Sequence, residues 1–211
     1  MRRAGKSIEI KTVEEIYRYV WLTIQDLYED GNINNFLDTM ANILESQLTK
    51  AFAAAINDSD LDAGEIDNEP FAGKLEDEIL AQYDFVDKLA KDIVEARNAE
   101  TGVDAFEPRA NLWASQYDNA YNAAILLAAT INGENLKWEI GETEAHCNSC
   151  ASLDGVVAPA TLWEELGVHP KDGPNDKLDC GGWRCDCKCD PTDEKATPGA
   201  REIIMIAMAQ G

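Results

Sequence analysis

The sequence predicts an α+β protein that is predominantly helical, with an N-terminal helical bundle followed by a small module of short strands. Apolar residues recur at three- and four-residue steps through roughly the first 130 positions, which is the period of amphipathic helices. After Gly133 this period gives way to short apolar runs between Gly- and Pro-rich loops. All six cysteines of the 211-residue chain lie in this later part, between Cys147 and Cys189. We therefore expect a helical bundle first and a small Cys-rich module after it.

The first two helices are predicted to form a hairpin. The sequence TVEE at residues 12–15 has the spacing of a capping box, and the apolar stripe behind it continues to Gly31. A second stripe runs from Phe36 to Ile56, and we expect its helix to be capped at Asn34 and Asn35. The link EDGNIN is short, which favours antiparallel packing of the two helices.

Two further helices are predicted before the period changes. The third carries apolar residues over positions 75–93 and ends before Thr101-Gly102. The fourth begins after Pro108, and its stripe runs without interruption over positions 112–131. We expect all four stripes to lie in the hydrophobic core, and no β-sheet to form within residues 1–130.

The remaining segments predict strands and short helices. LKWEI at 136–140 and GVVAPA at 155–160 are typical of short strands, and TLWEELG at 161–167 is typical of a helix of one or two turns. The terminal segment REIIMIAMA at 201–209 predicts a helix or strand. Either it offers an apolar strip to a partner protein, or it folds back onto the four helices.

The composition argues against several classes of partner. Forty acidic and eighteen basic residues leave a formal net charge of −22, so most of the surface repels a phosphate backbone and specific nucleic-acid binding is not expected. The longest apolar run, at 123–130, is far shorter than the roughly 18 residues that a membrane span requires. The basic N-terminus lacks the apolar stretch of a secretory signal, so we expect synthesis in the cytoplasm, where thiols stay reduced.

The acidic segment at residues 58–69 has a partial likeness to a calcium-binding loop. Its acids stand at the first, third, fifth and twelfth places of such a loop. Gly64 and Ile66, however, fall one place later than the loop geometry demands. We therefore interpret this segment as a solvated connection between helices.

The cysteine pattern is typical of structural zinc. Cys147 and Cys150 form a CxxC, in which two thiolates can share one tetrahedral ion. The other two ligands usually follow some tens of residues later, and CGGWRCDCKC at 180–189 lies at that distance. In a strand, Cys185, Cys187 and Cys189 would all point to one face. A small segment with few apolar residues cannot form a hydrophobic core large enough to fold alone, so a bound metal would stabilise it.

Several alternatives remain open from the residues alone. At most two of the later cysteines can complete a tetrahedron, and there are four of them: Cys180, Cys185, Cys187 and Cys189. His146 and His169 are additional candidates. Disulfides could replace metal in an oxidising environment, whereas a redox-active CxxC is less favoured because neighbouring cations are lacking.

Three segments in order resemble a known family. They are RANLWASQYDNAYNAA (109–124), LKWEIGETEAHCNSCASLDGVV (136–157) and LDCGGWRCDCKC (178–189). Together they resemble the C-terminal region of the phage minor head, or head morphogenesis, proteins similar to the F protein of phage Mu. The resemblance covers about the last hundred residues. It implies a helical region over residues 1–104, followed by a head-morphogenesis-like domain over residues 105–211 with a metal module at about 136–190.

The resemblance also implies ligands, with two departures from the family pattern. Ser115-Gln116 stands where members often have Thr-Glu, and Cys180-Gly-Gly-Trp replaces a His-Pro. By position, Cys180 takes the place of the histidine. The candidate ligands of one structural zinc ion are therefore Cys147, Cys150, Cys180, Cys185 and Cys187.

The function implied by the resemblance is that of a virion structural protein. A minor capsid protein of this kind acts in head assembly or genome packaging near the portal, with the portal or major capsid protein as its partner. We expect it in the phage head interior or neck, and in the host cytoplasm during assembly. No nucleophile–base pair with a recognisable spacing occurs, so we do not expect an enzyme. The alternative is a zinc-dependent effector or nuclease carried in the head.

Overall fold

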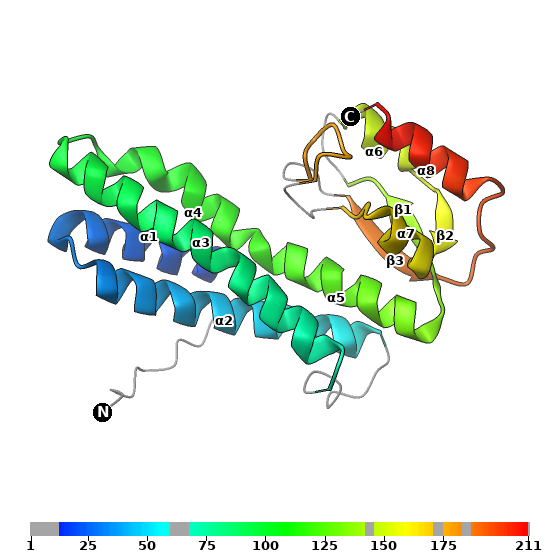
Figure 1. The fold of residues 1–211 in the computed structure, drawn as a ribbon, viewed down its shortest axis with the longest axis horizontal. Coiled ribbons are helices and arrows are strands. Elements are labelled where there is room, and N and C mark those ends of the chain that lie inside the picture. Colours follow the sequence, from blue (N-terminus) through cyan, green and yellow to red (C-terminus); the bar gives the residue numbers. More distant parts are fainter. Residues whose placement is uncertain (1–12, 60–67, 142–145, 171–174, 183–186, 211) are drawn as a thin grey trace. The chain divides into compact units, whose positions relative to one another are not determined.

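The structure is an α+β fold that is predominantly helical, with one small antiparallel sheet, as the sequence predicted (Figure 1). The computed structural model describes residues 13–59, 68–141, 146–170, 175–182 and 187–210. Its helices are α1 (Val13–Asp30), α2 (Ile33–Asp58), α3 (Phe71–Asn98), the 3-10 helix η2 (Val103–Phe106), α4 (Glu107–Ala114), α5 (Gln116–Asn132), α6 (Asn148–Leu153), α7 (Ala160–Leu166) and α8 (Ala200–Met208). Its strands are β1 (Asn135–Glu139), β2 (Val157–Pro159) and β3 (Lys188–Thr192).

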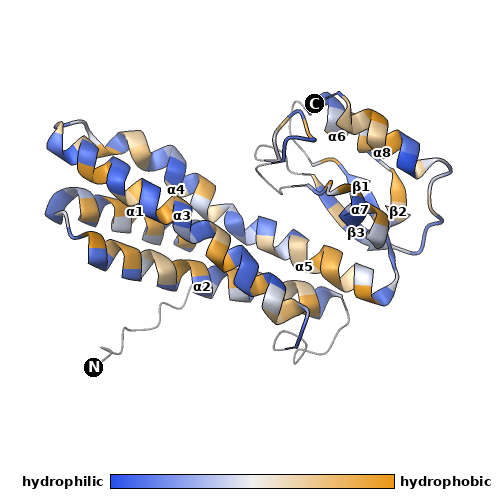
Figure 2. Cartoon of the chain, viewed as in Figure 1, coloured by the Kyte–Doolittle hydropathy of each residue, from blue (hydrophilic) through white to orange (hydrophobic). Residues whose placement is uncertain are grey.

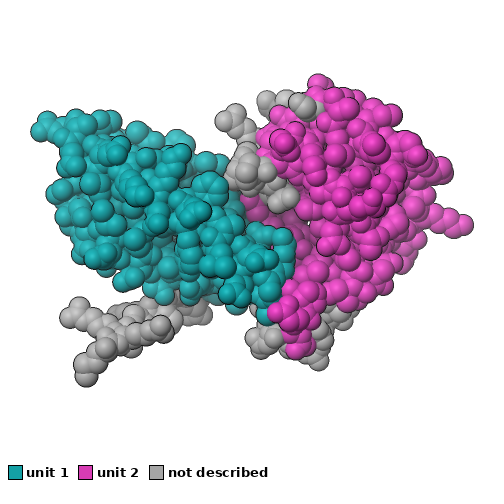
Figure 3. Space-filling model, viewed as in Figure 1, with its two compact units in different colours: residues 1–51, 72–117 teal, residues 52–71, 118–211 magenta. Residues whose placement is uncertain are grey.

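The chain forms two compact units, which Figure 3 colours separately. Unit 1 comprises residues 1–51 and 72–117, and unit 2 comprises residues 52–71 and 118–211. Helix α4 packs against α1 in unit 1, although it follows the predicted boundary at residue 104. The predicted boundary between two domains at residue 104 stays a prediction.

The acidic segment at residues 58–69, with its partial likeness to a calcium-binding loop, lies largely outside the described residues.

The hairpin of α1 and α2 is present, and the predicted cap of α2 is wrong. Figure 1 shows the two helices side by side after a short turn, in which Gly31 adopts a φ of 73°. Helix α2 begins at Ile33, and the Asn32 side chain accepts a hydrogen bond from the Asn35 amide at 3.2 Å. Asn32 is therefore the capping side chain, two residues before the predicted cap, because the turn at Gly31 already directs it toward the free amides.

The single helix predicted after Pro108 is two helices, α4 and α5, interrupted at Ser115. The Ser115 hydroxyl donates a hydrogen bond to the Leu112 carbonyl at 2.7 Å, as serine does when it competes with regular helix bonding. Because the helix is interrupted there, the apolar residues on either side do not form one stripe. Leu112 and Ile131, which were predicted to be core residues, are half exposed.

The core of unit 1 is built from the predicted apolar stripes. Figure 2 shows apolar and polar residues sharing each helix, as amphipathic packing requires. Polar contacts join the helix ends: Tyr17 donates to Glu107 at 2.8 Å, and Tyr28 donates to the Thr101 carbonyl at 2.6 Å. The hydrogen bond to Glu107 is the main reason why the pKa of Tyr17 is raised. The buried core residues are Ile16, Val20, Ile24, Leu27, Phe36, Met40, Ile43, Leu44, Val86, Leu89, Ala90, Ile93, Phe106, Ala110, Trp113 and Ala114.

The sheet of unit 2 has the strand order β2-β1-β3, with both pairings antiparallel. The predicted strands at 136–140 and 155–160 correspond to β1 and β2. Two fully buried tryptophans form the centre of this unit: Trp138 of β1 and Trp163 of α7 have ring centroids 5.7 Å apart. The Trp163 indole also donates to the Leu136 carbonyl at 3.2 Å. No strand occurs in the described part of residues 1–130, which agrees with the prediction.

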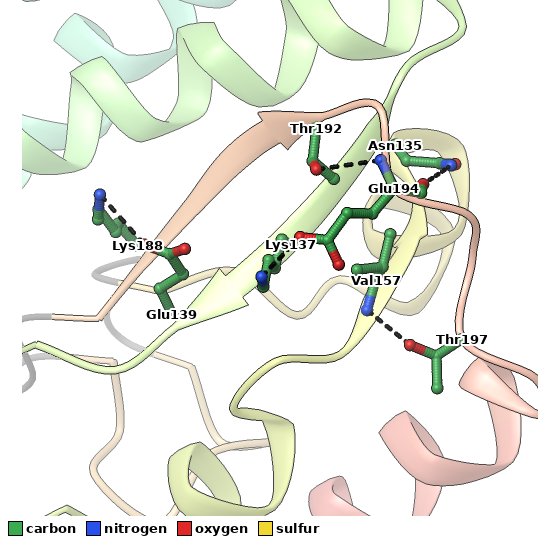
Figure 4. Close-up of polar contacts among 8 residues, drawn as sticks. All are labelled: Asn135, Lys137, Glu139, Val157, Lys188, Thr192, Glu194 and Thr197. Carbon is green, nitrogen blue, oxygen red and sulfur yellow. Dashed lines mark hydrogen bonds and ion pairs between the residues drawn. The ribbon is translucent and has the colours of Figure 1, made fainter.

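Polar side chains fasten β1 to its neighbours (Figure 4). Lys137 of β1 pairs with Glu194 at 2.7 Å, and this hydrogen bond is the main cause of its raised pKa. Lys188 of β3 lies between Asp190 and Glu139, and its pKa is raised chiefly by the hydrogen bond to Asp190. These groups are exposed, so the pairs set the register of the strands more than they stabilise the fold.

Thr197 covers the outer edge of β2. Its hydroxyl accepts from the Val157 amide at 3.0 Å, and its own amide donates to the Val157 carbonyl at 2.8 Å (Figure 4). Both polar groups of Val157 that face away from β1 are thereby satisfied. The link between β3 and α8 thus protects an edge that would otherwise offer free backbone groups.

We predict that Thr197→Val lowers the free energy of unfolding by about 1–2 kcal/mol, because the nearly buried Val157 amide loses its acceptor while the side-chain volume is kept. Thr192→Val is the matched control, since its hydroxyl accepts from the exposed Glu194 amide, and a change within about 0.5 kcal/mol is expected. Chemical denaturation of both variants checks this. Equal effects of the two substitutions would contradict the role given to Thr197.

Candidate metal centre

The CxxC forms the first turn of helix α6. Cys147 is the N-cap, with an extended backbone at φ −68° and ψ 158°, and its sulfur accepts a hydrogen bond from the Cys150 amide at 3.3 Å. The Ala151 amide donates to the Cys147 carbonyl at 3.0 Å and so starts the helix. This local geometry places the two thiols at the same end of α6. Hydrogen bonds from amides also stabilise a sulfur that carries negative charge.

The third thiol, Cys180, belongs to a tight turn over residues 175–181. The Asn175 amide donates to the Gly181 carbonyl at 3.0 Å, and the Gly181 amide donates to the Leu178 carbonyl at 2.7 Å. Gly181 and Gly182 have φ values of 65° and 76°, which glycine adopts without the strain of a Cβ. The side-chain amide of the buried Asn175 donates to the Gly167 carbonyl at 3.1 Å, which holds the turn against the end of α7.

Asp179 joins this turn to the start of α6. Its carboxylate accepts from the Asn148 amide at 3.2 Å, and its own amide donates to the hydroxyl of Ser149 at 3.2 Å. Ser149 is fully buried, so its hydroxyl is a fixed point of attachment. Cys180 follows directly in the chain. These two hydrogen bonds therefore place the Cys180 thiol beside the CxxC, although Cys180 lies thirty residues after Cys150 in the sequence.

The sulfurs of Cys147, Cys150 and Cys180 all lie within 4.8 Å of one another. The separation of Cys150 from Cys180 is 3.8 Å. A tetrahedral zinc ion with Zn–S bonds of about 2.3 Å holds neighbouring sulfurs about 3.8 Å apart, whereas a disulfide joins them at about 2.05 Å. The observed spacing therefore fits ligands of one metal ion. No disulfide joins the described cysteines, which are Cys147, Cys150, Cys180, Cys187 and Cys189.

The other candidate ligands are placed differently. Cys187 is fully buried and immediately precedes β3, and it does not belong to the group of three thiols. Cys189 lies within β3 opposite Trp138. His146 and His169 are also outside the group. Cys185 lies outside the described residues, so the ligand roles predicted for it and for Cys187 stay predictions. The strand begins only at Lys188, and thus covers less of the CxCxC run than expected.

Sequence reasoning missed the residues that position the thiols. Asp179 and Ser149 show no spacing that links them, since hydrogen bonding across a long loop leaves no periodic signal. Their only sequence mark is that each stands beside a cysteine. The adjacent glycines Gly181 and Gly182, in contrast, are a local sequence signal of the turn, and both adopt a positive φ.

The terminal segment forms helix α8 and packs within its own unit. Ile204 and Ala207 are fully buried, and α8 contacts α6 and β2. One face of the segment therefore packs on α6 and β2, a contact that neither alternative for this segment anticipated. Met205 and Ile206 on the other side remain more than half exposed. Figure 2 shows the resulting mixture of residues along α8.

Comparisons of this chain with family models, with curated proteins and with solved structures found no match. Among the helices in the described ranges, none has both the length and the apolar character required to cross a bilayer.

Proposed function

We propose that this chain is a structural protein of a phage head, and that one zinc ion stabilises its C-terminal unit. The observation that carries the zinc proposal is the group of three thiols, Cys147, Cys150 and Cys180, at a spacing that fits a tetrahedral ion. A fourth ligand completes such a site, and Cys185 and Cys187 are its candidates. An all-thiolate zinc site is normally closed to substrate, so the ion supports folding rather than catalysis.

The resemblance of residues 109–189 to head morphogenesis proteins supports the proposed place of action. The protein acts there by binding the portal or major capsid protein, in head assembly or genome packaging. The net charge of −22 suits a chain that works beside packed DNA without adhering to it. Met205 and Ile206 on α8 supply exposed apolar side chains for contact with a protein partner.

Elemental analysis tests the metal proposal. Protein purified under reducing conditions should contain close to one zinc per chain, because the thiolates prefer this ion to hard cations. A metal-free sample that is fully folded would refute the zinc site. Purified protein can also be assayed for zinc-dependent cleavage of DNA, for which no activity is expected; cleavage that is lost on chelation would favour the nuclease alternative.

Head assembly tests the place of action. The chain is co-expressed with the portal and major capsid proteins of the phage that encodes it, and assembled heads are isolated by sedimentation. The protein should sediment with the heads at a few copies per particle. A Met205→Asp, Ile206→Asp double variant should be folded but depleted from heads, if these residues contact the partner. If the isolated heads contain none of the co-expressed wild-type protein, the proposal is contradicted.

A further inference from the structure

Helix α6 serves two purposes in unit 2. It contributes Cys147 at its N-cap and Cys150 in its first turn to the candidate metal centre. It also forms a packing surface for α8, with Leu153 fully buried at its end and Ser152 donating to the side chain of Gln210 at 3.2 Å. The metal ligands and the docking surface for α8 therefore belong to one element.

This element is too short to be stable by itself. Helix α6 contains six residues, and isolated helices shorter than roughly 12 residues are marginal in water even with favourable sequences. Its first turn is held by the Cys147 cap and by the two contacts to Asp179, all of which lie at the metal centre. A bound ion would fix both thiolates of the turn and the neighbouring Cys180 together.

The other attachments of α8 are weaker. It contacts β2, and Arg201 pairs with Glu165 of α7 through two contacts, Nη1 to Oε1 at 3.0 Å and Nη2 to Oε2 at 2.5 Å. Both partners of this pair are exposed, and exposed ion pairs contribute little to stability. The buried side chains Ile204 and Ala207 are the apolar contribution of α8 to the unit. Their docking thus depends on the neighbouring α6 keeping its helical form.

We infer that metal occupancy controls the docking of the C-terminal helix α8. This inference rests on the zinc site proposed above. With zinc bound, α6 is held in place and α8 covers it. Without zinc, α6 loses its fixed first turn and α8 separates, so that Ile204 and Ala207 join Met205 and Ile206 as exposed apolar side chains. The β1–β2–β3 sheet keeps its fold, since its strand pairings and its tryptophan pair are formed by residues outside α6.

Hydrogen exchange measured by mass spectrometry tests this inference on the full chain. Zinc-loaded protein is compared with protein treated with a zinc chelator under reducing conditions. Amides of residues 148–153 and 200–210 should exchange at least about tenfold faster after zinc removal, whereas β1 and the unit 1 helix α1 should be unchanged. Unchanged protection of α8, or loss of protection in β1 together with α8, would overturn the inference.

A reciprocal measurement uses two neighbouring residues of α8. If zinc strengthens docking, weakening of docking must lower the zinc affinity by the same coupling factor. Ile204→Ala removes buried contacts and should weaken zinc binding about tenfold in competition with a chromophoric chelator. Met205→Ala, at an exposed site, should leave it unchanged. Equal zinc affinities of the two variants would also overturn the inference.

These outcomes separate the inference from the function on which it rests. Wild-type protein that binds no zinc refutes both the metal site and its control of α8. Stoichiometric zinc with an unaffected α8 refutes only the coupling and leaves the structural zinc site standing.

Discussion

Cys150→Ser is expected to lower the zinc content from about one ion per chain to near zero. A serine hydroxyl is a poor zinc ligand, and Cys150 is the fully buried member of the three-thiol group. We expect unit 2 to lose about 3 kcal/mol of stability or more, because the binding energy of structural zinc is also folding energy. Unit 1 should keep its own thermal transition. Elemental analysis and calorimetry measure the two effects.

Cys189→Ser is the matched control for this prediction. Cys189 lies within β3 opposite Trp138 and does not belong to the group of three thiols. Its replacement should leave one zinc per chain. If Cys189→Ser loses the ion while Cys150→Ser retains it, the assignment of the ligands is wrong. The same assay on Cys185→Ser and Cys187→Ser identifies which of the two predicted residues is the fourth ligand.

Trp163→Ala is expected to lower the free energy of unfolding of unit 2 by about 3–5 kcal/mol. Such losses follow when a large buried ring is removed and the cavity cannot collapse. Trp163 is fully buried, packs against Trp138 with ring centroids 5.7 Å apart, and holds the Leu136 carbonyl through its indole N–H. The cavity would therefore open directly beside the central strand β1.

Trp163→Phe separates packing from hydrogen bonding at this site. It keeps an aromatic ring beside Trp138 but leaves the Leu136 carbonyl without its indole donor. We expect a loss of about 1–3 kcal/mol for this variant, clearly smaller than for alanine. Urea denaturation followed by intrinsic tryptophan fluorescence measures both losses, and Trp138 is one of the four tryptophans that the variants keep. Identical losses for the two variants would show that the ring contributes no packing.

The N-terminal helices could be predicted because their signals are local. In α1 and α3 the spacing of apolar residues matches the helical period, and the turn at Gly31 follows from one residue with a positive φ. The interruption at Ser115 could not be predicted, since the apolar spacing continues across it. There the serine hydroxyl competes for the Leu112 carbonyl, and packing of α4 on α1 decides where the helix ends.

At the metal centre, the sequence by itself determined the CxxC turn, because the cap and the hydrogen bond between Cys147 and Cys150 involve residues three positions apart. It also determined the helical bundle, the position of the sheet and the acidic charge. Only the tertiary structure decided that Cys180 lies beside the pair. The physical reason is that Asp179, which accepts from the Asn148 amide and donates to the Ser149 hydroxyl, bridges about thirty residues of sequence. The folded loop that makes these hydrogen bonds leaves no local sequence pattern.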